Sequence, residues 1–250
     1  MEEIIHLILK IAATLIESGA EISRAEDSVS YMCRAYGATA TNAYATTSHI
    51  TVTVEMPDGL YTQTKRPKHI SNNFELLDRT NALVRYISAN APTAEEIREA
   101  IDALPRRKYP FYVTAVSQGF ISASFCLFFG SRSLIECLFA FLIGLALGFL
   151  GRLLDRMESN TLLKSFFLSF LASMLAFGVT RLGIIATPDY IIIGYIMNLI
   201  PGLGFTGAMR DLFVGDLFTG MVRILGALLL AASIAVGFIL TTILFGGVMS

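Results

Sequence analysis

The sequence predicts an α-helical membrane protein with about five transmembrane helices, preceded by a small cytoplasmic α+β domain in the order ααββαα. Its 250 residues have a mean hydropathy of +0.62 and are 54% apolar, which is too apolar for an ordinary soluble domain. The charges are shared unevenly: residues 1–110 hold 12 Lys/Arg and 14 Asp/Glu, whereas residues 111–250 hold 7 and 6. We therefore expect a soluble domain over residues 1–108 and a membrane domain over residues 109–250.

Charge and cysteine patterns narrow the class of protein further. Both parts of the chain are close to neutral, which argues against nucleic acid as a partner. The chain opens with Met1-Glu2-Glu3, which is acidic where a signal peptide is basic, so the first domain is expected to stay in the cytoplasm. The basic run Arg106-Arg107-Lys108 is typical of a cytoplasmic entry to a membrane segment. Three cysteines without CxxC or zinc spacing predict no metal site.

Two helices open the soluble domain. Apolar residues at helical spacing over residues 4–16 predict the first helix, which Gly19 ends. The second helix begins at Ser23, because Ser23 and Glu26 have the spacing of a capping box, in which both side chains satisfy free N–H groups of the first turn. Gly37 ends this second helix.

A β-hairpin follows the two helices. From residue 48 onward apolar and polar residues alternate and predict a half-buried strand. The turn Pro57-Asp58-Gly59 then leads to a returning strand over residues 60–66. Two more helices are expected over residues 73–89 and 94–104. Because a two-stranded hairpin is marginal alone, it needs the helices over it or pairing with another chain.

The membrane domain has five apolar segments, each near the roughly 20 residues that cross the hydrocarbon core. Lys and Arg concentrate on alternate connections between them, and the C-terminus has no basic residue. The positive-inside rule then predicts a cytoplasmic N-terminus and a C-terminus on the outer side. The expected spans are residues 112–129, 133–151, 161–180, 184–208 and 224–245.

The fourth span is interrupted by Pro201-Gly202. Proline removes a backbone donor and clashes with the preceding turn, so the helix is expected to break there. The freed backbone groups must then be buried in protein or line a wet cavity. Broken helices flanked by charges are the sequence sign of a substrate or ion site in transport proteins. The candidate residues lie at and after the break: Asn198, Pro201, Gly202, Arg210, Asp211, Gly215, Asp216 and Arg223.

Two motifs in this order resemble the bacterial threonine/serine exporter family. The first is Gly19-Ala20-Glu21…Arg24-Ala25-Glu26 ahead of the hairpin, with Thr46-Thr47-Ser48 leading into the strand. The second is Pro201-Gly202…Arg210-Asp211…Gly215-Asp216…Gly220…Arg223. The order of a soluble domain and about five spans is also similar, so the resemblance covers nearly the whole chain.

The resemblance implies export of threonine and serine, or of succinate and related dicarboxylates. Some members of the family are long chains with two membrane halves, and this chain resembles the N-terminal half alone. It is similar to the subunit of the split form that carries the soluble domain and works with a smaller all-membrane subunit. The resemblance thus implies a hetero-oligomer in the bacterial inner membrane with a small carboxylate or amino acid as substrate. The distribution of Lys and Arg places the C-terminus in the periplasm, and no cofactor is expected.

The charges after the break have two interpretations. In the first, Arg210, Asp211, Asp216 and Arg223 belong to an interfacial cytoplasmic loop and pair with one another or with lipid headgroups, which contributes little. In the second they line the pathway, with arginine holding a substrate carboxylate and aspartate exchanging a proton.

Two further polar residues in the spans also have two interpretations. Asn198 either makes an interhelical hydrogen bond or contacts a ligand. Glu136, four residues after Arg132, either forms an i,i+4 ion pair at the interface or couples a proton to transport.

The soluble-domain motif is interpreted in the same way. Glu26 is expected to cap a helix, or else to act with Glu21 and Arg24 at a regulatory or gating surface. Neighbouring strand residues point to opposite faces, so Ser48 and His49 are not expected to pair as nucleophile and base. The candidate residues of this motif are Gly19, Glu21, Arg24, Glu26, Thr47, Ser48 and His49.

Three functions compete. The broken fourth span favours a transport subunit. A membrane-anchored enzyme with a cytosolic catalytic domain is the second hypothesis, but the sequence has no metal spacing, phosphate-binding glycine loop or GxSxG motif. The third is a non-transporting regulatory or assembly subunit whose soluble domain senses a ligand. We expect the first, and expect no enzyme activity.

Overall fold

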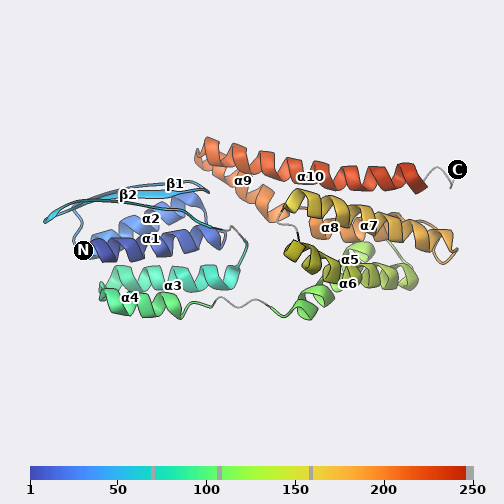
Figure 1. The fold of residues 1–250 in the computed structure, drawn as a ribbon, viewed down its shortest axis with the longest axis horizontal. Helices are drawn as coiled ribbons and strands as arrows, with labels where there is room; N and C mark the ends of the chain where they lie inside the picture. The colour runs from blue at the N-terminus through green and yellow to red at the C-terminus, as the bar shows by residue number, and fades with distance from the viewer. Residues whose placement is uncertain (69–70, 106–108, 158–159, 246–250) are drawn as a thin grey trace. The chain divides into compact units, whose positions relative to one another are not determined.

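The computed structural model describes residues 1–68, 71–105, 109–157 and 160–245 (Figure 1). The chain forms two compact units: the N-terminal unit contains Met1–Arg107 with Asp211–Thr219, and the membrane unit contains Lys108–Arg210 with Gly220–Ser250. The basic run expected at the membrane entry, Arg106 to Lys108, lies outside the described residues.

The N-terminal unit has three layers (Figure 1). An antiparallel sheet in the order β1-β2-β3 lies against α1 and α2, and α3 and α4 pack against the other side of these helices. Its elements are α1 (Glu2–Glu17), α2 (Ile22–Ala35), β1 (Ala40–Ala45), β2 (Ile50–Met56), β3 (Gly59–Lys65), α3 (Phe74–Asn90) and α4 (Ala94–Asp102).

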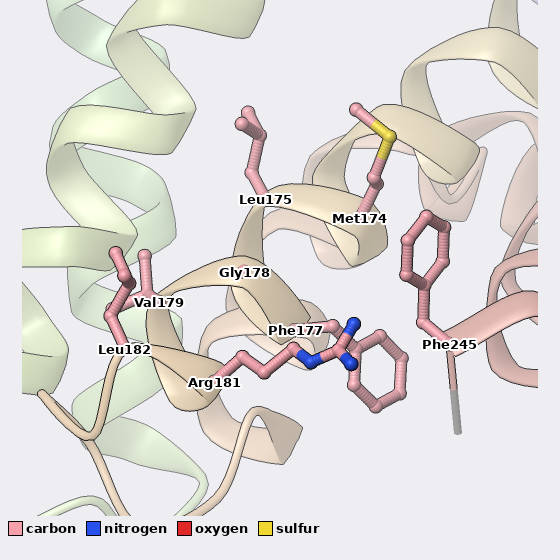
Figure 2. Close-up of a pocket in the computed structure, with 8 residues that line it drawn as sticks. All are labelled: Met174, Leu175, Phe177, Gly178, Val179, Arg181, Leu182 and Phe245. Atoms are coloured by element: carbon pink, nitrogen blue, oxygen red, sulfur yellow. The ribbon is translucent and has the colours of Figure 1, made fainter. Parts of the chain in front are cut away.

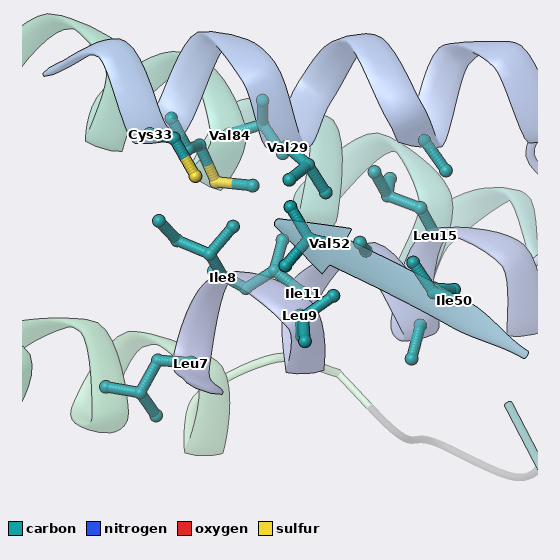
Figure 3. Close-up of a cluster of buried hydrophobic side chains, with 14 of the residues drawn as sticks. Leu7, Ile8, Leu9, Ile11, Leu15, Val29, Cys33, Ile50, Val52 and Val84 are labelled. Atoms are coloured by element: carbon teal, nitrogen blue, oxygen red, sulfur yellow. The ribbon is translucent and has the colours of Figure 1, made fainter. Parts of the chain in front are cut away.

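The core of this unit forms where α1, α2, β2 and α3 meet (Figure 3). Ile8 and Ile11 of α1 lie against Val29 of α2 and Val52 of β2, and each of these residues is at most 1% exposed. The helical spacing of α1 and the alternation of β2 therefore turn their apolar faces toward one another, as expected. Each such side chain stabilises the fold by about 1.5–3 kcal/mol.

The expected order ααββαα is incomplete, because the domain has three strands. β1 pairs along its whole length with β2, from Ala40 opposite Glu55 to Ala45 opposite Ile50. The strand holds alanine, threonine and asparagine with one exposed tyrosine, so its sequence has little apolar alternation. Pairing with β2, rather than its own propensity, makes it a strand.

The two expected capping boxes have different outcomes. The box at Thr93 and Glu96 is formed at the start of α4. The one expected at Ser23 and Glu26 is wrong, because α2 begins at Ile22 and has no side-chain cap. Glu26 Oε1 instead accepts a hydrogen bond of 2.6 Å from the backbone N–H of Ala45, the last residue of β1. That partner lies in the strand that the sequence pattern did not show.

We expect residues 1–105 to fold when separated from the membrane unit, because their buried apolar cluster runs only from Ile5 to Leu104. Circular dichroism and thermal unfolding of the fragment test this. Val52→Asp should unfold it, since it buries an unpaired charge. Leu60→Asp is the matched control, because Leu60 is 69% exposed. A wild-type fragment without cooperative unfolding would show that a partner completes the core.

The membrane unit contains four helices that are long and apolar enough to cross a membrane, or five if one bent pair counts as a single span. Their bounds differ from the expected spans: α6 ends at Met157 instead of residue 151, α8 and α9 cover residues 189–214 instead of 184–208, and α10 starts seven residues before residue 224 and so includes Arg223. Its helices are α5 (Phe111–Phe128), α6 (Leu134–Met157), α7 (Thr161–Arg181), α8 (Asp189–Leu199), α9 (Gly202–Val214, which runs beyond the unit) and α10 (Leu217–Phe245).

Close packing of α5 with α6 and α8 depends on glycine. A Cβ on Gly144 would lie 2.5 Å from Ser122 Oγ and 2.8 Å from the carbonyl oxygen of Gln118. A Cβ on Gly194 of α8 would lie 2.6 Å from the carbonyl oxygen of Ser122. Small residues let membrane helices approach closely, so both helices meet α5 at Ser122, which is completely buried.

Candidate functional site

The expected break in the fourth span is confirmed. Ile200 has an extended backbone (φ −67°, ψ 126°) before Pro201, because proline disfavours the helical conformation in the residue that precedes it. The axes of α8 and α9 differ by 51° across this break. A bent pair of helices therefore replaces a straight helix.

Three of the four charges after the break lie on helices, and Asp216 lies in the connection between α9 and α10. Arg210 and Asp211 belong to the last part of α9, and Arg223 lies in α10. Arg210 is exposed, whereas Asp211 is only 5% exposed. Arg210, Asp211 and Arg223 each have an interaction partner.

Gly215 and Asp216 form the tight connection between α9 and α10. Gly215 has a φ of +98°, which favours glycine, and its N–H donates to the carbonyl oxygen of Leu212. Asp216 Oδ1 accepts a hydrogen bond of 3.2 Å from the N–H of Thr219, the position of a helix N-cap. These two motif residues therefore have a structural role in the turn. The turn belongs to the N-terminal unit, whereas Arg210 and Arg223 belong to the membrane unit.

A polar pocket of about 230 Å³ lies among the helices of the membrane unit. It begins beside the break, because Asn198 and Leu199 at the end of α8 line it. Asn198 Nδ2 donates a hydrogen bond of 2.7 Å to Ser122 Oγ, which confirms the interhelical interpretation of this residue. The polar residues that line the pocket are Thr114, Gln118, Arg152, Asp155, Thr161, Lys164, Ser165 and Asn198.

The two ends of the pocket differ in charge. At one end, Lys164 Nζ of α7 lies 2.5 Å from Asp155 Oδ1 of α6, and Arg152 lines the pocket one turn before Asp155. At the other end are the amides of Gln118 and Asn198. Gln118 Oε1 is buried and lacks a hydrogen-bond partner, one of two such side-chain atoms among the described residues. A buried acceptor without a partner is costly, and a ligand group that donates a hydrogen bond removes that cost.

Most residues of this pocket were missed by sequence reasoning. Gln118, Arg152, Asp155 and Lys164 were not among the candidate site residues expected from the sequence. A signal was present, because an uncharged amide within an apolar span, as Gln118 is in α5, marks a polar contact inside the bundle.

The interpretation of Glu136 as an ion-pair partner of Arg132 is wrong. Glu136 is 8% exposed and accepts a hydrogen bond of 2.5 Å from Ser131 Oγ. Arg132 is exposed and is in none of the ion pairs found among the described residues. Glu136 is therefore a buried carboxylate in the first turn of α6, at the opposite end of this helix from Asp155.

A larger cavity of about 700 Å³ lies beside α7 and the end of α10 (Figure 2). Figure 2 shows apolar side chains such as Met174, Phe177 and Phe245 around it. Arg181 is the one charged residue among the described residues that line it. Such walls suit lipid acyl chains rather than a small hydrophilic metabolite, so we place the candidate site in the polar pocket.

In the N-terminal unit, Ser48 and His49 contact each other, which corrects the expectation that they point apart. Both lie in the turn before β2, where strand alternation does not apply. His49 Nδ1 is 3.1 Å from Thr46 Oγ1 and 3.3 Å from Ser48 Oγ. Thr46 Oγ1 also accepts from the backbone N–H groups of both residues, so the cluster holds the turn together. Thr47 is half-buried in the same turn.

The first motif is divided between two helix ends. Gly19 follows α1 with a φ of +98°, and a Cβ there would lie 2.9 Å from Asn72 Oδ1. Glu21 occupies the N-cap position of α2. Arg24 accepts a hydrogen bond at its carbonyl oxygen from Ser28 Oγ. Glycine is therefore required at residue 19 for both conformation and space.

Burial raises the pKa of the Glu26 carboxyl above its ordinary value of 4.5; the Ala45 N–H opposes this, and Asp216 and Asp27 add to the rise. The folded protein therefore binds this proton more tightly than the unfolded chain does. The contribution of this carboxyl to stability is therefore fully present below pH 4.5 and is lost as the pH rises through the folded pKa. We expect Glu26→Gln to remove this loss.

Thermal unfolding of the full chain at several pH values tests the prediction. Glu26→Gln should show a smaller fall in Tm with rising pH than the wild type. Glu55→Gln is the control, because it removes an exposed carboxylate from β2. An identical pH dependence in the Glu26 variant and the wild type would contradict the prediction.

Comparison with known proteins identifies the family. Residues 6–245 match the ThrE family, described as "Putative threonine/serine exporter". The chain is 24% identical over 246 residues to a "Probable threonine/serine exporter" of Mycobacterium tuberculosis, covering 96% of this chain and 46% of the relative. It is 20% identical over 244 residues to a "Probable succinate transporter subunit YjjP" of Klebsiella aerogenes, covering 96% of this chain and 93% of the relative.

No solved structure matches the chain. The chain spans about half the length of the Mycobacterium tuberculosis relative. The family match covers both structural units, from α1 to the end of α10. Together with the apolar helices, it makes the protein a multi-pass membrane protein. The chain belongs to the threonine/serine exporter family.

Proposed function

We propose that this chain is a subunit of an exporter that moves small carboxylate metabolites across the bacterial inner membrane, either threonine and serine or succinate-like dicarboxylates. The polar pocket carries the proposal. Ionisable and amide side chains are costly inside a bundle of apolar helices and mark sites for polar ligands. A volume of about 230 Å³ suits a metabolite smaller than the drug-sized ligands that fill about 300–1,000 Å³.

A second, smaller membrane subunit is part of the proposal. The Klebsiella aerogenes relative is named a transporter subunit, and the Mycobacterium tuberculosis relative is about twice as long as this chain. An odd number of spans would invert a related second half in the membrane, as in inverted-repeat transporters. We propose Arg210, Asp211, Asp216 and Arg223 as pathway residues, in which arginine binds a carboxylate and aspartate exchanges a proton.

Flux in proteoliposomes tests the function. We expect efflux of labelled serine, threonine or succinate from vesicles that contain this chain and its smaller partner, and none from vesicles with either chain alone. Equal flux from the partner alone would make this chain a regulatory or assembly subunit. Flux from this chain alone would contradict the two-subunit proposal, and no flux from the pair would contradict transport.

The orientation is a separate prediction. Five spans and the distribution of Lys and Arg predict a cytoplasmic N-terminus and a periplasmic C-terminus. A reporter active only in the periplasm should be active when fused after Ser250 and inactive when fused after Pro105. Inactivity at both fusion points would mean that the bent pair α8–α9 does not cross the membrane once, whereas activity at Pro105 would contradict the cytoplasmic N-terminus.

A further inference from the structure

We infer that Cys126 and Cys137 form a disulfide bond that joins the end of α5 to the start of α6. Both residues are free thiols in this structure, and Cys126 is completely buried while Cys137 is 8% exposed. The family comparison assigns no role to either cysteine. The inference rests on one part of the proposed function, the orientation of the chain in the membrane, and otherwise on the packing of these two helices.

The packing of α5 against α6 sets their register. A Cβ on Gly148 of α6 would lie 2.8 Å from Ala115 Cα of α5, so these two residues face each other. Cys126 follows Ala115 by eleven residues, and Cys137 precedes Gly148 by eleven. Eleven residues are about three turns of an α-helix, so each cysteine lies on the helix face that makes this contact. Because the two helices run in opposite directions, both steps lead to the same level and the cysteines lie opposite each other.

Local contacts place the two cysteines together. Their side chains interact directly and belong to one buried cluster. On another side, a Cβ on Gly194 of α8 would lie 3.3 Å from Cys126 Cβ. The connection between α5 and α6 is held at the same place, because the N–H of Ser131 donates to the carbonyl oxygen of Cys126 and its hydroxyl donates to Glu136. The two sulfur atoms are therefore neighbours in a packed environment.

Glycine brings the two helices close enough for a covalent bond between cysteines, which requires Cα atoms about 4.4–6.8 Å apart. The Cα atoms of Gly148 and Ala115 are at most about 4.3 Å apart, because a carbon–carbon bond adds only about 1.5 Å to the 2.8 Å contact. The close approach continues toward the cysteines. A Cβ on Gly119 would lie 2.9 Å from the carbonyl oxygen of Phe141, which is one turn from Cys137.

The compartment favours the oxidised state. α5 is the first span after the N-terminal unit, so its last turn and the first turn of α6 lie on the periplasmic side in the proposed orientation. Cys126 belongs to that last turn and Cys137 to that first turn. Disulfides form and persist in the bacterial periplasm and are rare in the cytosol. Cys33, which lies in the N-terminal unit, is then expected to stay reduced.

The bond forms by thiol–disulfide exchange with a disulfide-bearing oxidant. One cysteine thiolate attacks a sulfur of the oxidant, and the second cysteine then attacks the mixed disulfide. Two protons and two electrons pass from the cysteines to the oxidant, which leaves as two thiols. Because both cysteines are buried once the helices have packed, the exchange takes place during insertion, before α8 covers Cys126. The finished bond is then shielded from reductants.

Thiol trapping in bacterial cells that produce the full chain tests the bond. Acid precipitation stops exchange, and the denatured chain is labelled with a maleimide before or after reduction. We expect the wild type to take one label before reduction, on Cys33, and three after it. Cys126→Ser should take two labels in both conditions. Cys33→Ala is the matched control, because it should take no label before reduction and two after it.

The position of the bond is read by mass spectrometry. Trypsin cuts after Arg132, in the exposed connection between α5 and α6, so the two cysteines fall on separate peptides, residues 109–132 and 133–152. We expect one cross-linked species without reductant and two separate peptides with it. Three labels on the unreduced wild type, or a bond that joins two chains instead of these two peptides, would overturn the inference.

Oxidation of the purified chain separates the contact from its state in the cell. If oxidised glutathione joins the two peptides in detergent but the cell leaves them as thiols, the inference is overturned, and the fusions after Ser250 and Pro105 show whether the orientation is the cause. Neither measurement uses flux or the smaller subunit. A bridged pair in a chain that transports nothing would therefore keep the disulfide and contradict the proposed export.

Discussion

Replacing Gly144 by alanine is expected to reduce flux at least tenfold and to destabilise the membrane unit by about 1–3 kcal/mol. The added Cβ would meet Ser122 Oγ at 2.5 Å and the backbone carbonyl of Gln118 at 2.8 Å, so α5 and α6 must separate. That movement displaces Ser122, which Asn198 contacts, and Gln118 at the inner end of the pocket. Flux at equal expression and thermal unfolding in detergent measure the two effects.

The sign of the stability change makes this test informative. In an exposed helix, glycine to alanine stabilises by up to about 1 kcal/mol. Gly226→Ala in α10 is the matched control, because nothing lies within 4 Å of the added Cβ there. A destabilised Gly144 variant beside a neutral or stabilised Gly226 variant would support close packing of α5 and α6. Equal stability of the two variants would mean that these helices are farther apart.

Elements with strong internal periodicity were predictable from the sequence. The amphipathic face of α1, the alternation in β2 and the long apolar helices each follow from a repeated local pattern. The break at Pro201 was equally predictable, because proline acts on its own neighbours in the chain. β1 was not, because its strand state comes from six paired residues of β2 rather than from its own side chains.

The candidate site was harder to predict, since it depends on which helices lie together. Asn198 was found because it stands next to the break, whereas Gln118, Asp155 and Lys164 come from three other helices and share no sequence motif. The prediction that Glu26 caps α2 was wrong for the same reason. Its capping spacing was local, and its actual partner, Ala45, is nineteen residues away in an unforeseen strand. A capping pattern in the sequence predicts a helix end correctly only where no group from elsewhere in the fold binds the capping side chain.

Asp211→Asn and Asp216→Asn are expected to reduce export at least tenfold at equal membrane expression, if these carboxylates exchange a proton during transport. Asp211 is only 5% exposed, so loss of its charge changes a buried position rather than a solvated face. Asp216 caps α10, and asparagine caps helices as well as aspartate does, so Asp216→Asn removes the charge and keeps the cap. Flux with and without a pH gradient measures the effect.

Glu136→Gln is the comparison that decides the location of proton coupling. Glu136 is also buried, at 8% exposure, so Glu136→Gln matches Asp211→Asn in burial, and glutamine can still accept the hydrogen bond from Ser131. We expect near-normal flux from Glu136→Gln. Arg210→Lys should also lose flux if the guanidinium binds a carboxylate through two points, because lysine offers only a point charge. Normal flux in Asp211→Asn with loss in Glu136→Gln would move the coupling carboxylate to the first turn of α6, since only there would charge remain necessary.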